Sequence, residues 1–182
     1  MRLFSTTGYV ATTIQAVADE AGVALQTVYA VFGNKRELLR HTLEAAVAGD
    51  TDPQAVNERP ESLAIADEPD ARRRAEMDAA IVARISPRLA PIVKAVREAA
   101  TVDPEFAPTA AEITARRRQD MAAAAQLLAG PDELTMELDD AIGTLYILYS
   151  PEVFTALTGD LGWSIERYER WLADMLYRTV MS

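Results

Sequence analysis

Apolar residues recur at every third or fourth position along most of the chain, which is the period of an amphipathic α-helix. No segment alternates between apolar and polar residues with the period of two that is typical of a strand. The pattern therefore predicts an all-α fold, with helices that end at the glycine, proline and capping residues between the apolar stripes.

Two short helices joined by a tight turn are predicted near the N-terminus, followed by a longer third helix. Thr12 is expected to cap the first helix and Gly22 to end it. The second helix is expected to run from Ala24 to about Phe32. The third is expected over residues 35–47, with an apolar stripe formed by Leu38, Leu39, Leu43 and Ala46. This order is that of a helix-turn-helix.

Helix breakers predict a domain boundary near residue 48. Residues 49–69 are polar and acidic and contain three prolines, so a loop is expected there. The boundary separates a helix-turn-helix domain, residues 1–48, from a helical domain, residues 49–182.

The second domain is predicted to consist of helices only. Ser86-Pro87 is expected to interrupt helix formation between residues 70 and 100, and Asp103-Pro104 to start a helix that ends at Gly130. Two long apolar-rich helices are expected over residues 133–149 and 164–180, with one short helix between them.

Composition and charge narrow the class of protein. The 182 residues include no cysteine, which excludes disulfides and thiolate metal sites. The sequence has neither an apolar run of 18 residues nor a signal-peptide pattern, so a cytoplasmic protein that does not enter the membrane is expected. The net charge is −10, but residues 1–43 carry four basic and three acidic side chains, a net of +1, and the remainder carries −11. The acidity therefore belongs to the second domain.

Four segments at fixed spacing carry a resemblance to a known family. They are G-Y-V-A-T-T-I at 8–14, A-G-V at 21–23, T-V-Y at 27–29 and F-G-N-K-R-E-L-L at 32–39. Together they resemble the DNA-binding signature of the tetracycline-repressor-like (TetR) family. The resemblance implies a homodimeric, all-helical, ligand-responsive transcription regulator that binds double-stranded operator DNA.

The resemblance also implies which residues contact DNA. Phosphate contacts are expected from Thr12, Thr13, Tyr29 and Lys35, and base contacts from Gln15, Leu25, Gln26 and Thr27. Gln26 is the best candidate for an adenine contact, because its amide can both donate and accept a hydrogen bond. Capping by Thr12 and packing by Tyr29 are the alternative roles. The chain has Ala24 where the family commonly has serine, and Val31 where it often has histidine or tyrosine.

The start of the chain departs from the family pattern. In the family, L-F-x-x-x-G-Y closes a longer first helix, of which only the last turn is expected in residues 1–8. The first helix is therefore predicted to be largely absent. This leaves an alternative function open: a helical dimer that binds a ligand or a protein and no longer binds DNA.

The second domain is expected to bind an effector between its helices and to form the dimer. Candidate ligand-binding residues are Met77, Ile81, Ile85, Val96, Phe106, Met121, Tyr146, Tyr149 and Trp163. The resemblance implies a four-helix dimer interface made by the last two long helices, with contacts from Leu138, Ile142, Leu145, Tyr168, Trp171, Leu172 and Met175. All of these positions also suit ordinary core packing.

The sequence does not favour an enzyme. It contains no glycine-rich phosphate loop, no nucleophile with a nearby base and no metal-spaced cluster, and no cofactor is expected. His41, the one histidine, is expected to be a surface or packing residue. The leading hypothesis is a repressor that a small-molecule effector releases from its operator.

Overall fold

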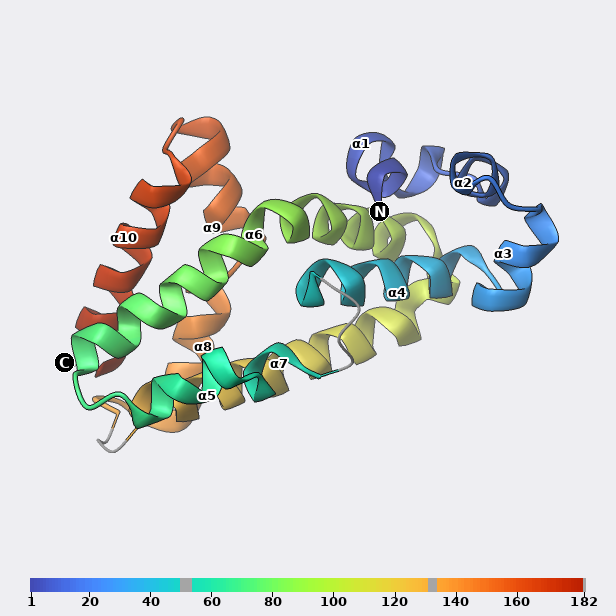
Figure 1. The fold of residues 1–182 in the computed structure, drawn as a ribbon. Coiled ribbons are helices and arrows are strands. Elements are labelled where there is room, and N and C mark those ends of the chain that lie inside the picture. Colours follow the sequence, from blue (N-terminus) through green and yellow to red (C-terminus); the bar gives the residue numbers. More distant parts are fainter. Residues whose placement is uncertain (50–53, 131–133, 182) are drawn as a thin grey trace. The chain divides into compact units, whose positions relative to one another are not determined.

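The computed structural model describes residues 1–49, 54–130 and 134–181, and every regular element within these ranges is helical (Figure 1). The all-α prediction is therefore confirmed. Contacts divide the chain into two compact units. The N-terminal unit comprises Met1–Thr51 and Arg88–Thr114, and the C-terminal unit comprises Asp52–Pro87 and Ala115–Ser182.

Four helices open the N-terminal unit: α1 (Arg2–Ala11), α2 (Ile14–Ala21), α3 (Leu25–Phe32) and α4 (Lys35–Ala48). The first is longer than the single turn expected, although Gly8, with φ 78°, breaks it into two parts. Its two aromatic side chains explain why it forms, because Phe4 and Tyr9 are both buried and their rings stack with centroids 6.4 Å apart.

The helix-turn-helix forms as predicted, but its first cap is a different residue. Thr13, not Thr12, caps α2, because its hydroxyl accepts the backbone N–H of Ala16 at 3.0 Å. Thr12 is only 1% exposed and donates its own hydroxyl to the carbonyl of Gly8 at 2.6 Å. A buried hydroxyl needs a partner, and the break at Gly8 provides one. Gly22, with φ 67°, ends α2 as expected.

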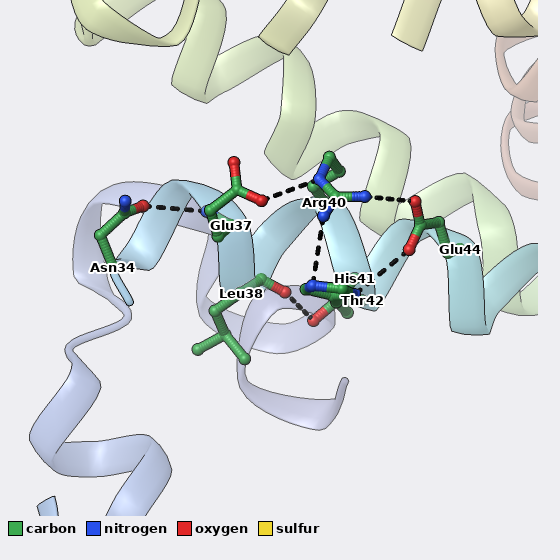
Figure 2. A network of polar contacts seen from close by, with 7 residues as sticks. All are labelled: Asn34, Glu37, Leu38, Arg40, His41, Thr42 and Glu44. Carbon is green, nitrogen blue, oxygen red and sulfur yellow. Dashed lines mark hydrogen bonds and ion pairs between the residues drawn. The ribbon is translucent and has the colours of Figure 1, made fainter. Parts of the chain in front are cut away.

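The next two helices begin differently. Ala24 precedes α3 in an extended conformation and offers no side-chain cap. Asn34 caps α4, with its Oδ1 accepting the N–H of Glu37 at 3.0 Å, as Figure 2 shows. The same figure shows the Arg40 guanidinium donating to Glu37 at 2.9 Å and to Glu44 at 2.6 Å. These side chains pair with one another on the outer face of α4, and the apolar stripe of this helix faces the core.

A segment from the middle of the chain completes the core of the N-terminal unit. The two-domain division at residue 48 had assigned this segment to the second domain. Its buried side chains pack with those of α1 to α4: Ile92, Ala95, Val96, Ala99 and Phe106. The proposal that Val96 and Phe106 line an effector site in the second domain is therefore wrong, because both are core residues of the N-terminal unit. Apolar periodicity alone could not separate the two cores.

The segment predicted to be a loop contains a helix. Among its described residues, α5 (Pro60–Asp67) follows a 3-10 turn at Val56–Glu58. Pro60 occupies the first helical turn, where a missing N–H costs nothing, so this proline starts a helix. Pro53 lies outside the described residues.

The break predicted at Ser86-Pro87 is absent, and α6 (Ala71–Val102) is one helix of 32 residues. Ser86 donates its hydroxyl to the carbonyl of Val82 at 2.7 Å. Burial of Ala83 and Ile92 on either side of the proline holds the helix together. Packing therefore overrides a proline in this helix.

The remaining helices complete the two units. Asp103-Pro104 starts the 3-10 turn Pro104–Phe106 and then α7 (Ala107–Ala129), as predicted. The C-terminal unit resumes within α7, at Ala115. Further along lie α8 (Leu138–Leu148), α9 (Pro151–Thr155), a π-helical segment at Ala156–Asp160, α10 (Ile165–Leu176) and a π-helical segment at Tyr177–Met181. Residue 133, the expected start of the helix before Tyr149, lies outside the described residues, and α8 itself begins at Leu138.

The core of this unit uses residues that were expected at a dimer interface. Leu145, Tyr168 and Leu172 are 0% exposed within one chain. They therefore cannot present their side chains to a second copy, and this part of the interface prediction is wrong.

Candidate nucleic-acid interface and effector site

The recognition helix α3 has one buried face and one open face. Val28 is 4% exposed and packs in the core, whereas Gln26 and Thr27 are exposed and Tyr29 is 49% exposed. Leu25 is half-buried and packs against the same core. A helix with polar side chains on its free face and an apolar anchor behind it can enter a major groove and reach base edges.

Lys35 lies at the start of α4, beside the ring of Tyr9. Its Nζ is 4.2 Å from the ring centroid and donates to the carbonyl of Val10 at 3.3 Å. Burial lowers the pKa of Lys35. An ammonium group has three protons, so the bond to Val10 leaves donors for a phosphate.

The other candidates on α2 differ in accessibility. Thr13 and Gln15 are exposed, and the Gln15 side chain donates to Asp19 at 2.7 Å. Thr12 is buried and uses its hydroxyl internally. The sequence-based prediction of a phosphate contact from its side chain therefore fails on accessibility.

The remaining basic side chains of residues 1–43 are held by carboxylates. Arg2 pairs with Glu20 at 2.8 Å, and Arg40 pairs with two glutamates of α4. Arg36 donates two hydrogen bonds to Asp103, at 2.8 and 3.0 Å. The candidate DNA face therefore depends on hydroxyls, amides, one lysine and the N–H groups at helix N-termini rather than on free arginines.

The predicted effector residues that remain in the C-terminal unit are half-buried: Met77, Ile81, Ile85, Met121, Tyr146, Tyr149 and Trp163. Two of their rings are covered by cations of the chain itself. The Arg117 guanidinium lies 4.1 Å from the centroid of Tyr146, and that of Arg167 lies 4.0 Å from the centroid of Trp163. Trp163 also meets Trp171 edge-on, with ring centroids 6.2 Å apart.

A buried carboxylate in this unit was missed by the sequence analysis. Asp78 on α6 is 6% exposed, and the Tyr149 phenol donates to its Oδ2. Burial raises the pKa of Asp78 to about 6, and burial beside this carboxylate raises that of Tyr149 well above its usual value. The sequence held a signal, since Asp78 stands on the apolar stripe between Ala75 and Val82.

Tyr168 adds an unsatisfied group beside Asp78. Its hydroxyl is buried and has no hydrogen-bond partner among the residues that the structure describes. Burial raises the pKa of Tyr168, and the nearby hydroxyl of Ser86 lowers it. The two hydroxyl groups do not form a hydrogen bond. A buried hydroxyl without a partner costs about 1–3 kcal/mol. The arrangement can supply a negative charge, two phenols and aromatic rings to a bound molecule.

In the described parts of the chain, no three His, Asp or Glu side chains gather as a metal site would require. Over the same ranges, none of the helices is both long and apolar enough to cross a membrane.

Comparison with known proteins agrees with this geometry. Residues 1–42 match the family model of bacterial regulatory proteins, tetR family. No curated protein sequence matches the chain. Two solved structures share the fold over 98% of this chain and 92% of theirs. One is a transcriptional regulator from Saccharomonospora viridis in complex with choline, with a TM-score of 0.66 and 19% identity. The other is a TetR-family transcriptional regulator from Rhodococcus sp., with a TM-score of 0.68 and 18% identity.

The family match covers the helix-turn-helix described above, including α2, α3 and the start of α4. Proteins of this family are DNA-binding regulators and not enzymes, in agreement with the sequence analysis. Residues 1–42 of this chain therefore match the tetR family of bacterial regulatory proteins, a family of DNA-binding transcriptional regulators.

Proposed function

We propose that the chain is a homodimeric cytoplasmic repressor that binds double-stranded operator DNA and leaves it when a small molecule binds the C-terminal unit. The observation that carries the proposal is the open face of α3, where Gln26 and Thr27 are exposed while Val28 anchors the helix from behind. Without such an anchor a groove-reading helix would not keep its orientation.

The DNA contacts divide into positioning and reading. We assign phosphate contacts to Thr13, Tyr29, Lys35 and the N–H groups at the start of α2, and base contacts to Gln15, Gln26 and Thr27. Leu25 is half-buried, so its contribution is limited to apolar contact at the edge of the groove. Thr12 positions the turn after α1 through its bond to Gly8.

Dimer formation follows from the geometry of operators. A single short recognition helix reads only a few base pairs. Two helix-turn-helix domains related by a two-fold axis read two half-sites about one helical turn apart. The accessible residues of the proposed interface are Leu138 (43% exposed) on α8, with Ile142, Trp171 and Met175 partly exposed.

Release from DNA requires an effector that favours the conformation unable to bind the operator. A ligand with equal affinity for both conformations releases nothing, and a shift from about 1:99 to 99:1 needs about 10⁴-fold preference. The Saccharomonospora viridis protein, which shares the fold, holds choline. That complex supports a small-molecule effector for this chain as well.

A mobility-shift titration tests the proposal. The full chain is titrated onto DNA from the neighbouring intergenic region at about 50 and 200 mM salt, with an unrelated fragment of equal length as control. Retardation of the intergenic fragment at lower protein concentration is expected, with affinity falling steeply between the two salts. Equal retardation of both fragments, or none at either salt, contradicts the proposal.

A further inference from the structure

One group of side chains in the C-terminal unit has a charge that no described residue balances. Asp78 is the one carboxylate below 9% exposure in the described residues, and its one polar partner is the neutral phenol of Tyr149. No described arginine or lysine forms an ion pair with it. An ion in a low-dielectric interior is costly unless it is paired. When Asp78 is ionised, its negative charge is therefore unmatched by any described residue.

The neighbours of Asp78 suit a cation better than they suit water. Tyr168 is buried beside the carboxylate and leaves its hydroxyl without a partner. Its ring meets Phe154 edge-on at 5.1 Å and lies 6.1 Å from that of Trp171, which in turn contacts Trp163. Aromatic faces around a carboxylate attract organic cations through the ring quadrupole as well as through charge.

The same unit already places cations on aromatic rings. Arg167 lies over Trp163, and Arg117 lies over Tyr146. Asp78 and the rings of Tyr149 and Tyr168 form the negatively charged part of this aromatic region, and within the described residues no ion pair or cation–π contact places a cation on them.

We propose that the effector is a small organic cation, a quaternary or protonated amine, which Asp78 binds by charge with Tyr149 and Tyr168 around it. This inference rests on the proposed function, because it names the effector class of the regulator. The cation replaces the Tyr149 phenol as partner of the carboxylate, and a hydroxyl or carbonyl of the ligand accepts the free hydrogen of Tyr168. A neutral molecule of the same shape satisfies the hydroxyl but leaves the charge unmatched.

Binding to the full chain without DNA tests the inference directly. Choline, tetramethylammonium and cyclohexylammonium are the probes, and 3,3-dimethyl-1-butanol is the neutral molecule with the shape of choline. The chain has two tryptophans, Trp163 and Trp171, both in this aromatic region, so intrinsic fluorescence reports binding and calorimetry gives the affinity. We expect at least one cation to bind, and to bind at least tenfold more tightly than the neutral alcohol.

Variants locate the site. Asp78→Asn should weaken cation binding at least tenfold and reduce the preference over the neutral alcohol, and Tyr168→Phe should weaken it by a smaller factor. Asp139→Asn is the matched control, because Asp139 is an exposed carboxylate of α8 in the same unit and should leave binding unchanged. Circular dichroism verifies that each variant is folded.

Three results would overturn the inference: no binding of any of the three cations, equal binding of the neutral alcohol, or unchanged binding by the folded Asp78→Asn variant. The mobility shift described above is a separate measurement. A chain that retards its DNA but binds no cation refutes the inference alone, whereas one that binds a cation through Asp78 but retards no DNA refutes the proposed function alone.

Discussion

The carboxylate of Glu98 on α6 accepts the backbone N–H of Tyr9 at 2.7 Å, and its second oxygen accepts that of Val10 at 3.2 Å. These N–H groups follow Gly8, where α1 breaks and leaves them without helical partners. Glu98 therefore caps these N–H groups from α6, outside residues 1–48, and Gly8 is needed because a Cβ at that position would lie 2.5 Å from Glu98 Oε2.

The first prediction concerns this cap. Glu98→Ala removes the acceptor for two N–H groups and should lower the free energy of unfolding by about 1–3 kcal/mol. Gly8→Ala should also destabilise, since it strains a positive φ and displaces the carboxylate. Denaturant unfolding measures both, with Lys94→Ala, an exposed change on the same helix, as control. A Glu98→Ala variant as stable as the Lys94→Ala control would contradict the capping role.

A second prediction concerns the missing cap of α3. Ala24 has φ −67° and ψ 146°, the conformation in which a serine hydroxyl accepts an N–H of the first helical turn. Ala24→Ser should therefore stabilise the chain by about 1 kcal/mol. The same replacement inside the helix, Ala30→Ser, should destabilise it by about 0.5 kcal/mol, because serine is a poorer helix former than alanine. Opposite shifts in the denaturation midpoint are expected, and shifts of the same sign would refute the argument.

The sequence predicted the helices of the helix-turn-helix domain well, because capping residues, glycines and apolar stripes within each helix define them. Gly22 ends α2, and the stripe that includes Leu39 and Ala46 faces the core, as the pattern indicated. Capping was less certain, since Thr12 and Thr13 are adjacent and chemically alike. Only the break at Gly8, which gives Thr12 an acceptor, decides that Thr13 caps the helix.

Tertiary contacts explain what the sequence did not reveal. Prolines gave opposite outcomes: Pro60 starts a helix where a loop was expected, and Pro87 lies inside one where a break was expected. The helical spacing of apolar residues predicts that Val96 is buried, but it does not tell which of the two cores contains it. Tyr168 was expected at a dimer surface and lies in the interior. Asp78 was not predicted to be buried because acidic side chains are rarely buried, even though its position lies on an apolar stripe.

A third prediction follows from the raised pKa of Asp78. Its folded pKa is about 6 against an ordinary value of 3.8, so the folded state binds more protons between these values. Stability should therefore fall as pH rises from about 4 to about 6, by an amount on the order of 3 kcal/mol for this group. Asp78→Asn removes the effect and keeps an acceptor for Tyr149. The variant should be more stable than the original chain at pH 8, and the difference should shrink towards pH 4.

Thermal unfolding at several pH values, with Asp139→Asn as the exposed control, checks this prediction. Curves for the Asp78→Asn variant and the original chain that run parallel from pH 4 to 8 would rule it out. A positive result would mean that the chain sacrifices stability to keep a buried carboxylate, which is typical of groups retained for binding.

The last prediction separates reading from positioning on the DNA. Gln26→Ala should weaken binding to the operator by about 1–3 kcal/mol, or roughly 5- to 150-fold, and relax specificity at one base pair, because a bidentate amide contact is lost. Lys35→Ala should weaken binding to all sequences alike and reduce the slope of log affinity against log salt by about 1, because one phosphate contact is lost. Gln119→Ala, exposed on α7, is the control. Fluorescence anisotropy with the operator and single-base variants at several salts measures both quantities. If Gln26→Ala weakened every sequence equally while Lys35→Ala changed specificity, the two assignments would have to be exchanged.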